Sequence, residues 1–96
     1  MSLTQLESFV AVAEEQHVGR AARRLHVSQP PLTRRIRSLE HELGVELFAR
    51  TTRGMRLLPA GEVLLEHARE ILERVHIARD RVTEAAPPPQ RVNRST

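Results

Sequence analysis

Apolar residues in the first half of the chain recur at intervals of three and four, the spacing of helices that each bury one face. The first such stretch ends near Gln16 and has two candidate capping boxes at its start, Ser2 with Gln5 and Thr4 with Glu7. We favour Ser2, because the apolar pattern already begins at Leu3. A second stretch opens at Gly19 and covers Arg20–Leu25. It predicts a helix of about two turns, which is stable only when it packs against other elements.

The third stretch is the most regular. Ser28 is a good N-cap for it, and two prolines follow in the first turn, where their missing N–H groups have no intrahelical partner. His26-Val27 forms the tight connection before it, and Gly44 ends it as a C-cap. The face expected to be buried consists of Leu32, Ile36, Leu39 and Leu43.

Two short segments, Val45–Arg50 and Arg56–Leu58, flank a turn that contains Gly54 and predict a β-hairpin. Three compact helices followed by a small hairpin form a winged helix–turn–helix. We therefore expect a mainly α-helical protein with this fold over residues 1–58, and the helix–turn–helix motif at about residues 18–37.

Pro59 begins a longer helix that we expect to end at about Ala86. At about 1.5 Å per residue it is a rod of about 40 Å, and only its first two turns can fold back on so small a domain. Its apolar positions alternate four and three residues apart, a heptad seam that favours pairing with a second helix. Residues 59–86 are therefore predicted to form a linker helix that makes a homodimer, or a higher oligomer. The expected dimerisation residues are Leu64, Ala68, Ile71, Leu72, Val75, Ala78 and Val82.

Three prolines follow this helix, and the remaining residues are polar, so we expect residues 87–96 to be a disordered tail.

Composition excludes several classes of protein. The 96 residues include no Cys, so no disulfide and no zinc site of Cys type can form. They also include no Lys and only two aromatic side chains. The five histidines lack the H-x-x-x-H spacing of a helical metal site, and neither a catalytic grouping nor a glycine-rich loop is present. We expect no enzyme, no metal and no cofactor. No apolar run approaches the roughly 20 residues of a membrane span, and no secretory signal is visible, which predicts a cytoplasmic protein without a membrane partner.

The positive charge is concentrated. All 15 basic residues are arginine, the formal net charge is +3, and the stretch from Arg20 to Arg37 holds six arginines and no carboxylate. Solvated helices usually mix signs, because opposite charges three or four residues apart support each other. A stretch of one sign instead makes a field suited to a polyanion.

The N-terminal half of the third helix carries side chains that suit duplex DNA. Its first turn presents free N–H groups and a positive dipole end to a phosphate. Gln29 can pair its amide with adenine N6 and N7, and Thr33 offers a methyl group to thymine. Arg34 and Arg37 can reach guanine or backbone oxygens. The alternative is an ordinary amphipathic helix with a polar outer face.

The hairpin carries a second group of arginines. Arg53 at the tip, flanked by Arg50 and Arg56, can enter a minor groove or contact phosphates, and an exposed turn with incidental arginines is the alternative. We take Arg35, Arg50 and Arg56 as phosphate-contact candidates.

The chain closely resembles the N-terminal domain of LysR-type transcriptional regulators. The resemblance covers residues 1 to about 86 and is carried by the pieces A-A-x-x-L-x-V-S-Q-P and L-E-x-x-L-G-V-x-L-F-x-R, which begin at Ala21 and Leu39. It implies a winged helix–turn–helix, a linker helix that dimerises, and binding to interrupted palindromes in promoters. It also implies DNA contacts at Ser28, Gln29, Pro30, Thr33, Arg34 and Arg53.

The sequence departs from the family pattern at several positions. Gly19 stands where family members often have Ser or Thr, which weakens the cap of the second helix, and Leu58 replaces a Thr that would cap the linker helix. Val18 replaces a common aromatic residue, which loosens the packing of the second helix. Family members continue into an effector domain, and nothing here corresponds to it. We therefore expect a regulator truncated after the linker helix, or a natural stand-alone DNA-binding module, with no small-molecule effector site.

Together these observations predict a sequence-specific DNA-binding transcriptional regulator of LysR type, associated with the bacterial nucleoid, with double-stranded promoter DNA as its partner. An alternative is a dimerisation-competent interaction module that pairs with and modulates a full-length relative. An enzyme or ligand sensor is disfavoured because the groupings for it are missing. The expected DNA-binding residues are Ser28, Gln29, Pro30, Pro31, Thr33, Arg34, Arg37 and Arg53.

Overall fold

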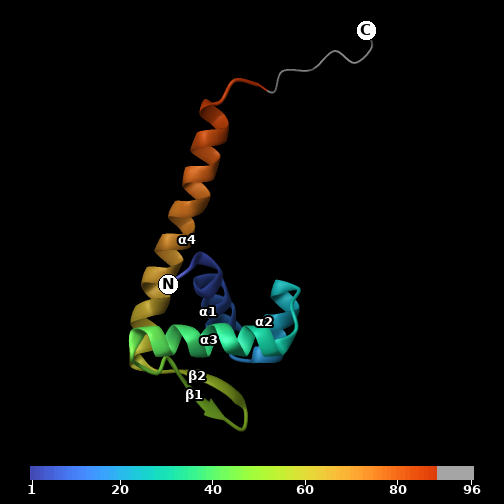
Figure 1. The fold of residues 1–96 in the computed structure, drawn as a ribbon, viewed down its shortest axis with the longest axis vertical. Helices are drawn as coiled ribbons and strands as arrows, with labels where there is room; N and C mark the ends of the chain where they lie inside the picture. Colours follow the sequence, from blue (N-terminus) through green and yellow to red (C-terminus); the bar gives the residue numbers. More distant parts are fainter. Residues whose placement is uncertain (89–96) are drawn as a thin grey trace.

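The structure, a computed structural model, describes residues 1–88. Its elements are α1 (Leu3–Glu15), α2 (Val18–Leu25), α3 (Gln29–Leu43), β1 (Phe48–Thr51), β2 (Gly54–Leu57) and α4 (Pro59–Ala85). The first three helices and the hairpin form one body, and α4 extends from it as a rod (Figure 1). The predicted mainly α-helical winged helix–turn–helix is confirmed. Apart from its first two residues, the predicted tail lies outside the described residues.

The core lies where α1, α3 and the start of the hairpin meet. Phe9 of α1 is fully buried, and its ring centroid is 5.3 Å from that of Phe48 in β1. Leu32, Ile36 and Leu39 are buried as predicted, but Leu43 is 40% exposed. It is the last residue of α3, beside the exposed loop 44–46, so the helix has already run past the core.

The caps of the helices agree only in part with the predictions. Ser2 and Gln5 form the expected capping box of α1. The prediction that Gly19 opens α2 and leaves it weakly capped is wrong, because α2 begins at Val18 and His17 is its N-cap. The Nδ1 atom of His17 accepts a hydrogen bond from the backbone N–H of Arg20 at 3.2 Å. A ring nitrogen therefore accepts the capping hydrogen bond that a hydroxyl or carboxylate oxygen usually accepts.

The remaining helix ends follow the sequence closely. His26 and Gly44 have the left-handed φ values of +58° and +72° that end α2 and α3. Ser28 is the N-cap of α3 by position, but its side chain makes no capping hydrogen bond. Leu58 likewise precedes α4 without a side-chain cap, as its apolar side chain predicts.

The hairpin begins later than predicted, and both of its strands extend farther toward the turn. Its first strand begins at Phe48 rather than Val45, and its second begins at Gly54 rather than Arg56. The backbone N–H groups of Leu47 and Phe48 donate to the carboxylate of Glu40 at 2.7 and 3.3 Å. Because Glu40 takes the N–H of Leu47, this residue keeps only one bond to the facing segment within residues 1–88, from the N–H of Leu58 to its carbonyl at 2.9 Å, and the strand begins at Phe48.

The first part of α4 packs against α1. Ala68 is fully buried, and Leu64, Leu65 and Leu72 are partly buried against the same core. The contact is longer than the two turns expected, since a groove beside Leu3 of α1 is lined by residues as far along α4 as Arg79. Beyond it the helix is exposed, and Val82 is 70% exposed. Among residues 1–88, no helix is long and apolar enough to cross a membrane.

Candidate nucleic-acid interface

The outer face of α3 presents the predicted polar side chains together. The buried stripe fixes this geometry, because side chains on the opposite side of the helix must face solvent. Of the expected set, Thr33 and Pro31 are half-buried, and the exposed members are Ser28, Gln29, Pro30, Arg34 and Arg37. No carboxylate among residues 1–88 forms an ion pair with Arg34 or Arg37. Their charges are therefore available to a ligand.

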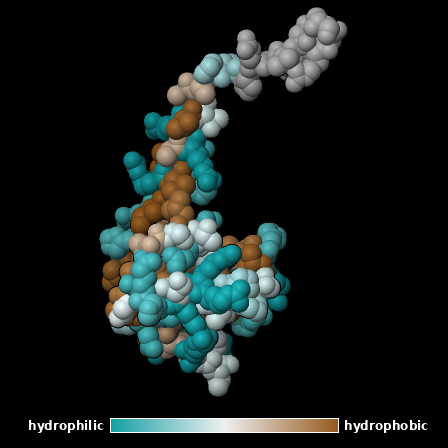
Figure 2. Space-filling model, in the orientation of Figure 1, coloured by the Kyte–Doolittle hydropathy of each residue, from teal (hydrophilic) through white to brown (hydrophobic). Residues whose placement is uncertain are grey.

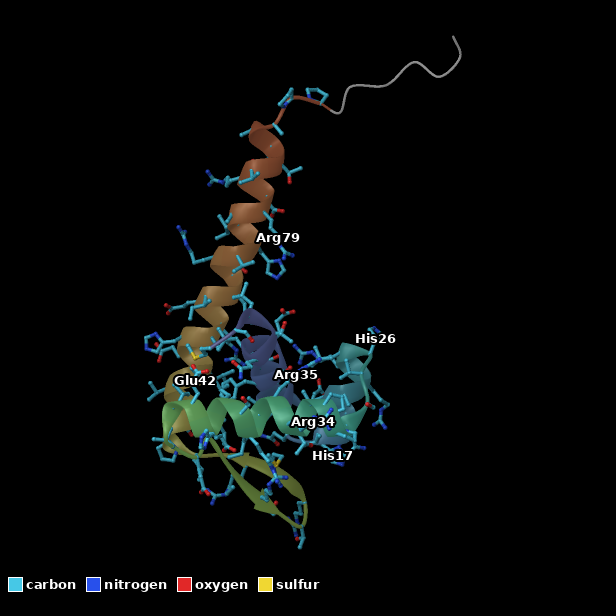
Figure 3. The ribbon with its side chains drawn as sticks, in the orientation of Figure 1. His17, His26, Arg34, Arg35, Glu42 and Arg79 are labelled. Atoms are coloured by element: carbon cyan, nitrogen blue, oxygen red, sulfur yellow. The ribbon has the colours of Figure 1, made fainter. Side chains whose placement is uncertain are left out.

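Arg35 behaves differently from its two neighbours. It is half-buried, and its Nη1 atom donates to the hydroxyl of Ser8 in α1 at 3.4 Å. Figure 3 shows Arg35 between α3 and α1, with Arg34 on another side of α3. The hydroxyl of Ser8 is the polar group of a residue only 1% exposed. This contact makes Arg35 part of the α1–α3 packing, so we leave it out of the proposed phosphate contacts.

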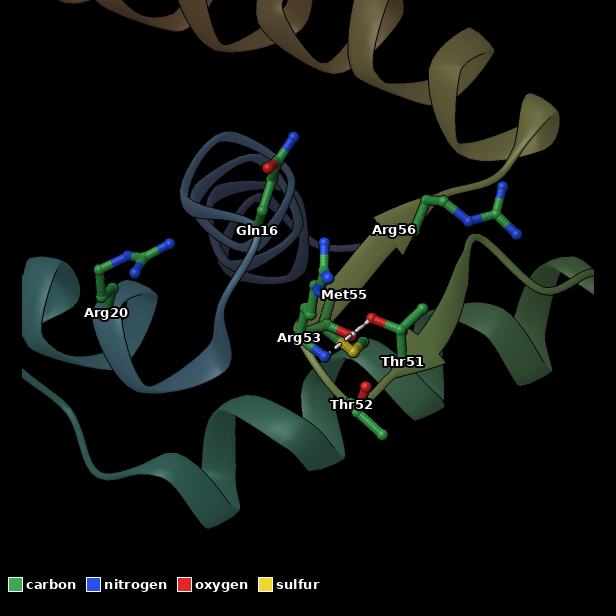
Figure 4. A pocket seen from close by; sticks show the side chains of 8 residues that line it. Gln16, Arg20, Thr51, Thr52, Arg53, Met55 and Arg56 are labelled. Atoms are coloured by element: carbon green, nitrogen blue, oxygen red, sulfur yellow. Dashed lines mark hydrogen bonds between the residues drawn. The ribbon is translucent and has the colours of Figure 1, made fainter.

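The wing presents Arg53 from a tight turn. The hydroxyl of Thr51 accepts a hydrogen bond from the backbone N–H of Arg53 at 3.2 Å, drawn in Figure 4, and donates to the carbonyl of Gly54 at 3.1 Å. Arg50 and Arg56 are exposed on the two strands. The three arginines therefore lie at the tip and along the hairpin, as the sequence predicts.

A hydrogen bond fixes the wing to the corner between α1 and α2. The backbone N–H of Met55 donates to the carbonyl of Gln16 at 3.1 Å, and the Met55 side chain is buried. Beside this contact lies an open cleft of about 620 Å³, lined by Gln16, Arg20 and residues 51–56, with no carboxylate in its lining (Figure 4). The wing is thus held at a set distance from the helices by main-chain contact.

The acid-free stretch is not uniformly free of acidic partners, because two of its arginines meet carboxylates of α1. Arg24 pairs with Glu14 at 2.8 Å and with Glu15 at 3.3 Å. The Nε atom of Arg20 lies 3.9 Å from the Glu15 carboxylate, and its Nη2 donates to the backbone carbonyl of Glu15 at 2.7 Å. Glu14 also accepts two hydrogen bonds from Arg69 of α4. These residues lie on three helices and connect them.

The pKa values of this group are shifted by the same contacts. The hydrogen bond from Arg24 holds the pKa of Glu14 below its usual value, against partial burial, which raises it, and Arg69 lowers it further. The hydrogen bond to Glu14 correspondingly raises the pKa of the Arg24 guanidinium. The helical spacing of three and four residues does not reveal this network, because its partners lie on different helices, five to 55 residues apart.

The predicted dimerisation residues divide into two groups. Ala68 is buried within the chain, and Leu64 and Leu72 are partly buried against α1, so this part of the seam already has a partner. We leave Ala68 out of the proposed dimer contact. Apolar side chains continue along the exposed rod, shown in brown in Figure 2. The exposed ones include Ile71, Ala78 and Val82, whereas Val75 is half-buried and lines the groove beside Leu3.

Comparison with known proteins assigns the family. The pattern of bacterial regulatory helix-turn-helix proteins of the lysR family matches residues 3–62. The HTH-type transcriptional regulator ClcR of Pseudomonas putida is 56% identical over 81 residues, which are 84% of this chain and 28% of ClcR. TfdT of Cupriavidus pinatubonensis is 50% identical over 86 residues, 90% of this chain and 38% of TfdT. The chain therefore spans about a third of the length of these relatives.

Solved structures give the same result for the fold. The crystal structure of the CbnR_DBD–DNA complex matches with a TM-score of 0.86 and 49% identity, covering 91% of this chain and 100% of that one. The BenM_DBD/benA site 1 DNA complex matches with a TM-score of 0.87 and 38% identity, covering 92% and 99%. The relatives named here are regulators rather than enzymes. The chain has four helices and a hairpin wing, and the family pattern covers residues 3–62. This chain therefore belongs to the lysR family of bacterial regulatory helix-turn-helix proteins.

Proposed function

We propose that this chain is the DNA-reading part of a LysR-type transcriptional regulator and that it binds duplex DNA sequence-specifically as a homodimer. The observation that carries the proposal is the exposed face of α3, on which Gln29, Arg34 and Arg37 lie together without a carboxylate partner among the described residues. The similar structures of CbnR_DBD and BenM_DBD are complexes with DNA, which supports it.

In this proposal α3 lies in the major groove. The major groove is wide enough to admit one helix, and the base edges in it carry a distinct pattern of donors and acceptors for each base pair. Gln29 reads an adenine with its amide, and Thr33 and Arg34 reach the following bases. Ser28, Pro30 and Pro31 at the start of α3 bring the backbone close to the duplex. Because Ser28 makes no capping bond, its hydroxyl is available to a phosphate.

The remaining arginines position the protein on the backbone. Arg37, together with Arg50 and Arg56 of the wing, contacts phosphates, and Arg53 enters the minor groove beside them. Two copies joined through α4 would place two recognition helices on half-sites that are whole turns of DNA apart. We also infer that the chain is not an enzyme and works in the bacterial cytoplasm, on DNA of the nucleoid.

The test begins with a library of duplexes that have a randomised central segment, from which the bound fraction is sequenced. For the preferred duplex, Gln29→Ala should reduce discrimination at one base pair in each half-site by about 1–3 kcal/mol. The reason is that the lost amide made both hydrogen bonds to that base. Competition titrations with duplexes changed at single base pairs measure the effect. Unchanged discrimination at every position would refute the base-reading role.

A matched pair of arginine variants tests the phosphate contacts. Arg37→Ala should weaken binding to all duplexes alike and flatten the dependence of log Kd on log salt by roughly one contact. Arg79→Ala removes the same charge from α4, away from the reading face (Figure 3), and should leave the slope unchanged. Equal slopes for the two variants would count against the placement of Arg37.

The second candidate is an interaction module that pairs with a full-length relative, and the exposed apolar stretch of α4 favours it. The two functions differ in one result. A DNA reader binds the selected duplex by itself, whereas an interaction module only lowers the operator binding of a relative with which it is mixed.

A further inference from the structure

A small hollow lies over the backbone of Gly19, at the start of α2. An ideal Cβ placed on Gly19 would stand 2.9 Å from Cε1 and 3.1 Å from Nδ1 of His17, and 3.2 Å from the side-chain Nε2 of Gln29. The first contact is shorter than real Cβ atoms make, and the other two are tighter than most, so these groups lie this close to the backbone because residue 19 has no side chain. The two side chains that line the hollow come from different elements: His17 is the N-cap of α2, and Gln29 is the first residue of α3.

The two walls of the hollow differ in how firmly they are held. The ring of His17 is fixed by its capping hydrogen bond from the N–H of Arg20. The amide of Gln29 ends a flexible side chain and has no hydrogen-bond partner among residues 1–88. A Cβ at position 19 would approach the His17 ring most closely, at 2.9 Å, and would also displace the Gln29 amide, which can move at little cost because its side chain is flexible.

We propose that Gly19 is a positioning residue for Gln29: its missing Cβ, together with the His17 ring, forms the seat in which the Gln29 amide rests. This inference rests on the proposed function, in which Gln29 reads a base. A seated amide occupies fewer rotamers in the free protein, so less conformational entropy is lost when both of its groups pair with adenine. Gly19 thus acts on specificity without touching DNA.

A purely structural role for Gly19 predicts a different outcome. Glycine is unfavourable inside a helix relative to alanine, because it loses more backbone freedom on folding. This gain from alanine is opposed by the 2.9 Å approach of the new Cβ to the His17 ring, so Gly19→Ala should change the melting temperature little. What it should lower is discrimination at the base pair read by Gln29.

The experiment uses the full chain and the duplexes selected from the randomised library. Gln29→Ala first identifies the base pair that Gln29 reads. Gly19→Ala should then lose roughly threefold to tenfold of the discrimination at that base pair, and none at the others. Its affinity for a non-preferred duplex should stay within about twofold, because the phosphate contacts are intact. In the double variant Gly19→Ala/Gln29→Ala, the discrimination should equal that of Gln29→Ala alone, because the effect of position 19 passes through the amide.

A second variant tests the other wall of the hollow while keeping α2 capped. His17→Asn retains a side-chain oxygen at the N-cap but removes the imidazole ring. We expect the fold to be retained and the same base pair to lose discrimination.

The outcomes separate the two proposals. If Gln29→Ala leaves discrimination unchanged, the base-reading function fails. If Gln29→Ala reduces it but Gly19→Ala and His17→Asn do not, the positioning role is overturned. It is equally overturned if Gly19→Ala lowers the melting temperature or weakens all duplexes alike, since either result would mean a structural effect.

Discussion

At the scale of single residues, Gly54 determines the position of the wing relative to the α1–α2 corner. A Cβ on this residue would lie 2.3 Å from the carbonyl oxygen of Gln16, and its φ is +135°. Any other L-residue would carry both a steric conflict with backbone and an unfavourable conformation. Gln16 and the neighbouring Met55 share the hydrogen bond that fixes the hairpin to the α1–α2 corner. The position of Arg53 therefore depends on the glycine next to it.

We expect Gly54→Ala to lower the free energy of unfolding by roughly 1–3 kcal/mol, because backbone must move or strain must be stored. Urea unfolding followed by circular dichroism measures the loss. Gly44→Ala is the matched control, since Gly44 also has positive φ but nothing lies within 4 Å of its Cβ position. It should cost only the backbone strain. Equal losses in the two variants would show that the contact with Gln16 contributes nothing.

The residues of the site differ in how far the sequence could predict them. Gln29, Arg34 and Arg53 follow from spacing, since the buried stripe of α3 and a glycine-containing turn fix their faces. The Nδ1 cap supplied by His17 could not be predicted in this way, because imidazole rarely caps a helix. Nor could the contact of Arg35 with Ser8, which depends on how α1 crosses α3. The local pattern shows which face of a helix is exposed. Contacts between residues distant in the sequence determine which polar side chains form hydrogen bonds inside the protein.

At the scale of elements, a charged network connects three helices. Glu14 of α1 binds Arg24 of α2 and Arg69 of α4, so it ties the helix–turn–helix to the linker helix. Its pKa is lowered in the folded chain, chiefly by the hydrogen bond from Arg24. A lowered carboxyl pKa contributes stability above the unfolded value, which is about 4.3 for Glu, and this stability is lost as the pH falls through the folded value.

Glu14→Gln should therefore flatten the acid side of the stability curve. We expect a loss of about 1 kcal/mol or less at neutral pH, because the groups are partly exposed, and no loss at a pH below the folded pKa of Glu14. Thermal unfolding at a series of pH values measures the difference. Glu66→Gln, at an exposed position of α4 without an ion pair in the described part of the chain, is the control and should leave the curve unchanged. A constant offset between Glu14→Gln and the unchanged chain at all pH values would contradict this electrostatic account.

Element boundaries show the same division between local and distant causes. The helices are predictable from caps and periodicity, and α3 and α4 begin at the expected prolines or beside them. The first strand begins later than predicted because Glu40, seven residues before Leu47, takes the N–H groups of Leu47 and Phe48. No pattern of alternation within residues 45–50 contains that information.

At the scale of the whole molecule, the rod formed by α4 has two parts. The nearer part packs on α1 through Ala68 and its neighbours, and the farther part has no cover within residues 1–88. Apolar residues continue at heptad spacing into that exposed part, where Val82 is 70% exposed. A helix that keeps an apolar seam beyond its own domain is stabilised when a second helix covers it. This is the physical ground for the proposed homodimer.

Val82→Glu tests the farther part alone. It places a charge in the seam without touching the core, so the fold should remain intact while the dimer dissociation constant rises by about tenfold or more. Sedimentation equilibrium measures that constant. Thr83→Glu adds the same charge one residue away, off the seam, and should leave the dimer unchanged.

The DNA readout links this surface to function. When one recognition helix of a dimer is bound to a duplex with two half-sites, the second is held near its half-site at a high effective concentration. Binding to a single half-site needs only one recognition helix. Val82→Glu should therefore weaken binding to the two-half-site duplex and leave a single half-site unaffected. If the dimer constant and both affinities stay as they were, the farther part of α4 is not the dimer contact.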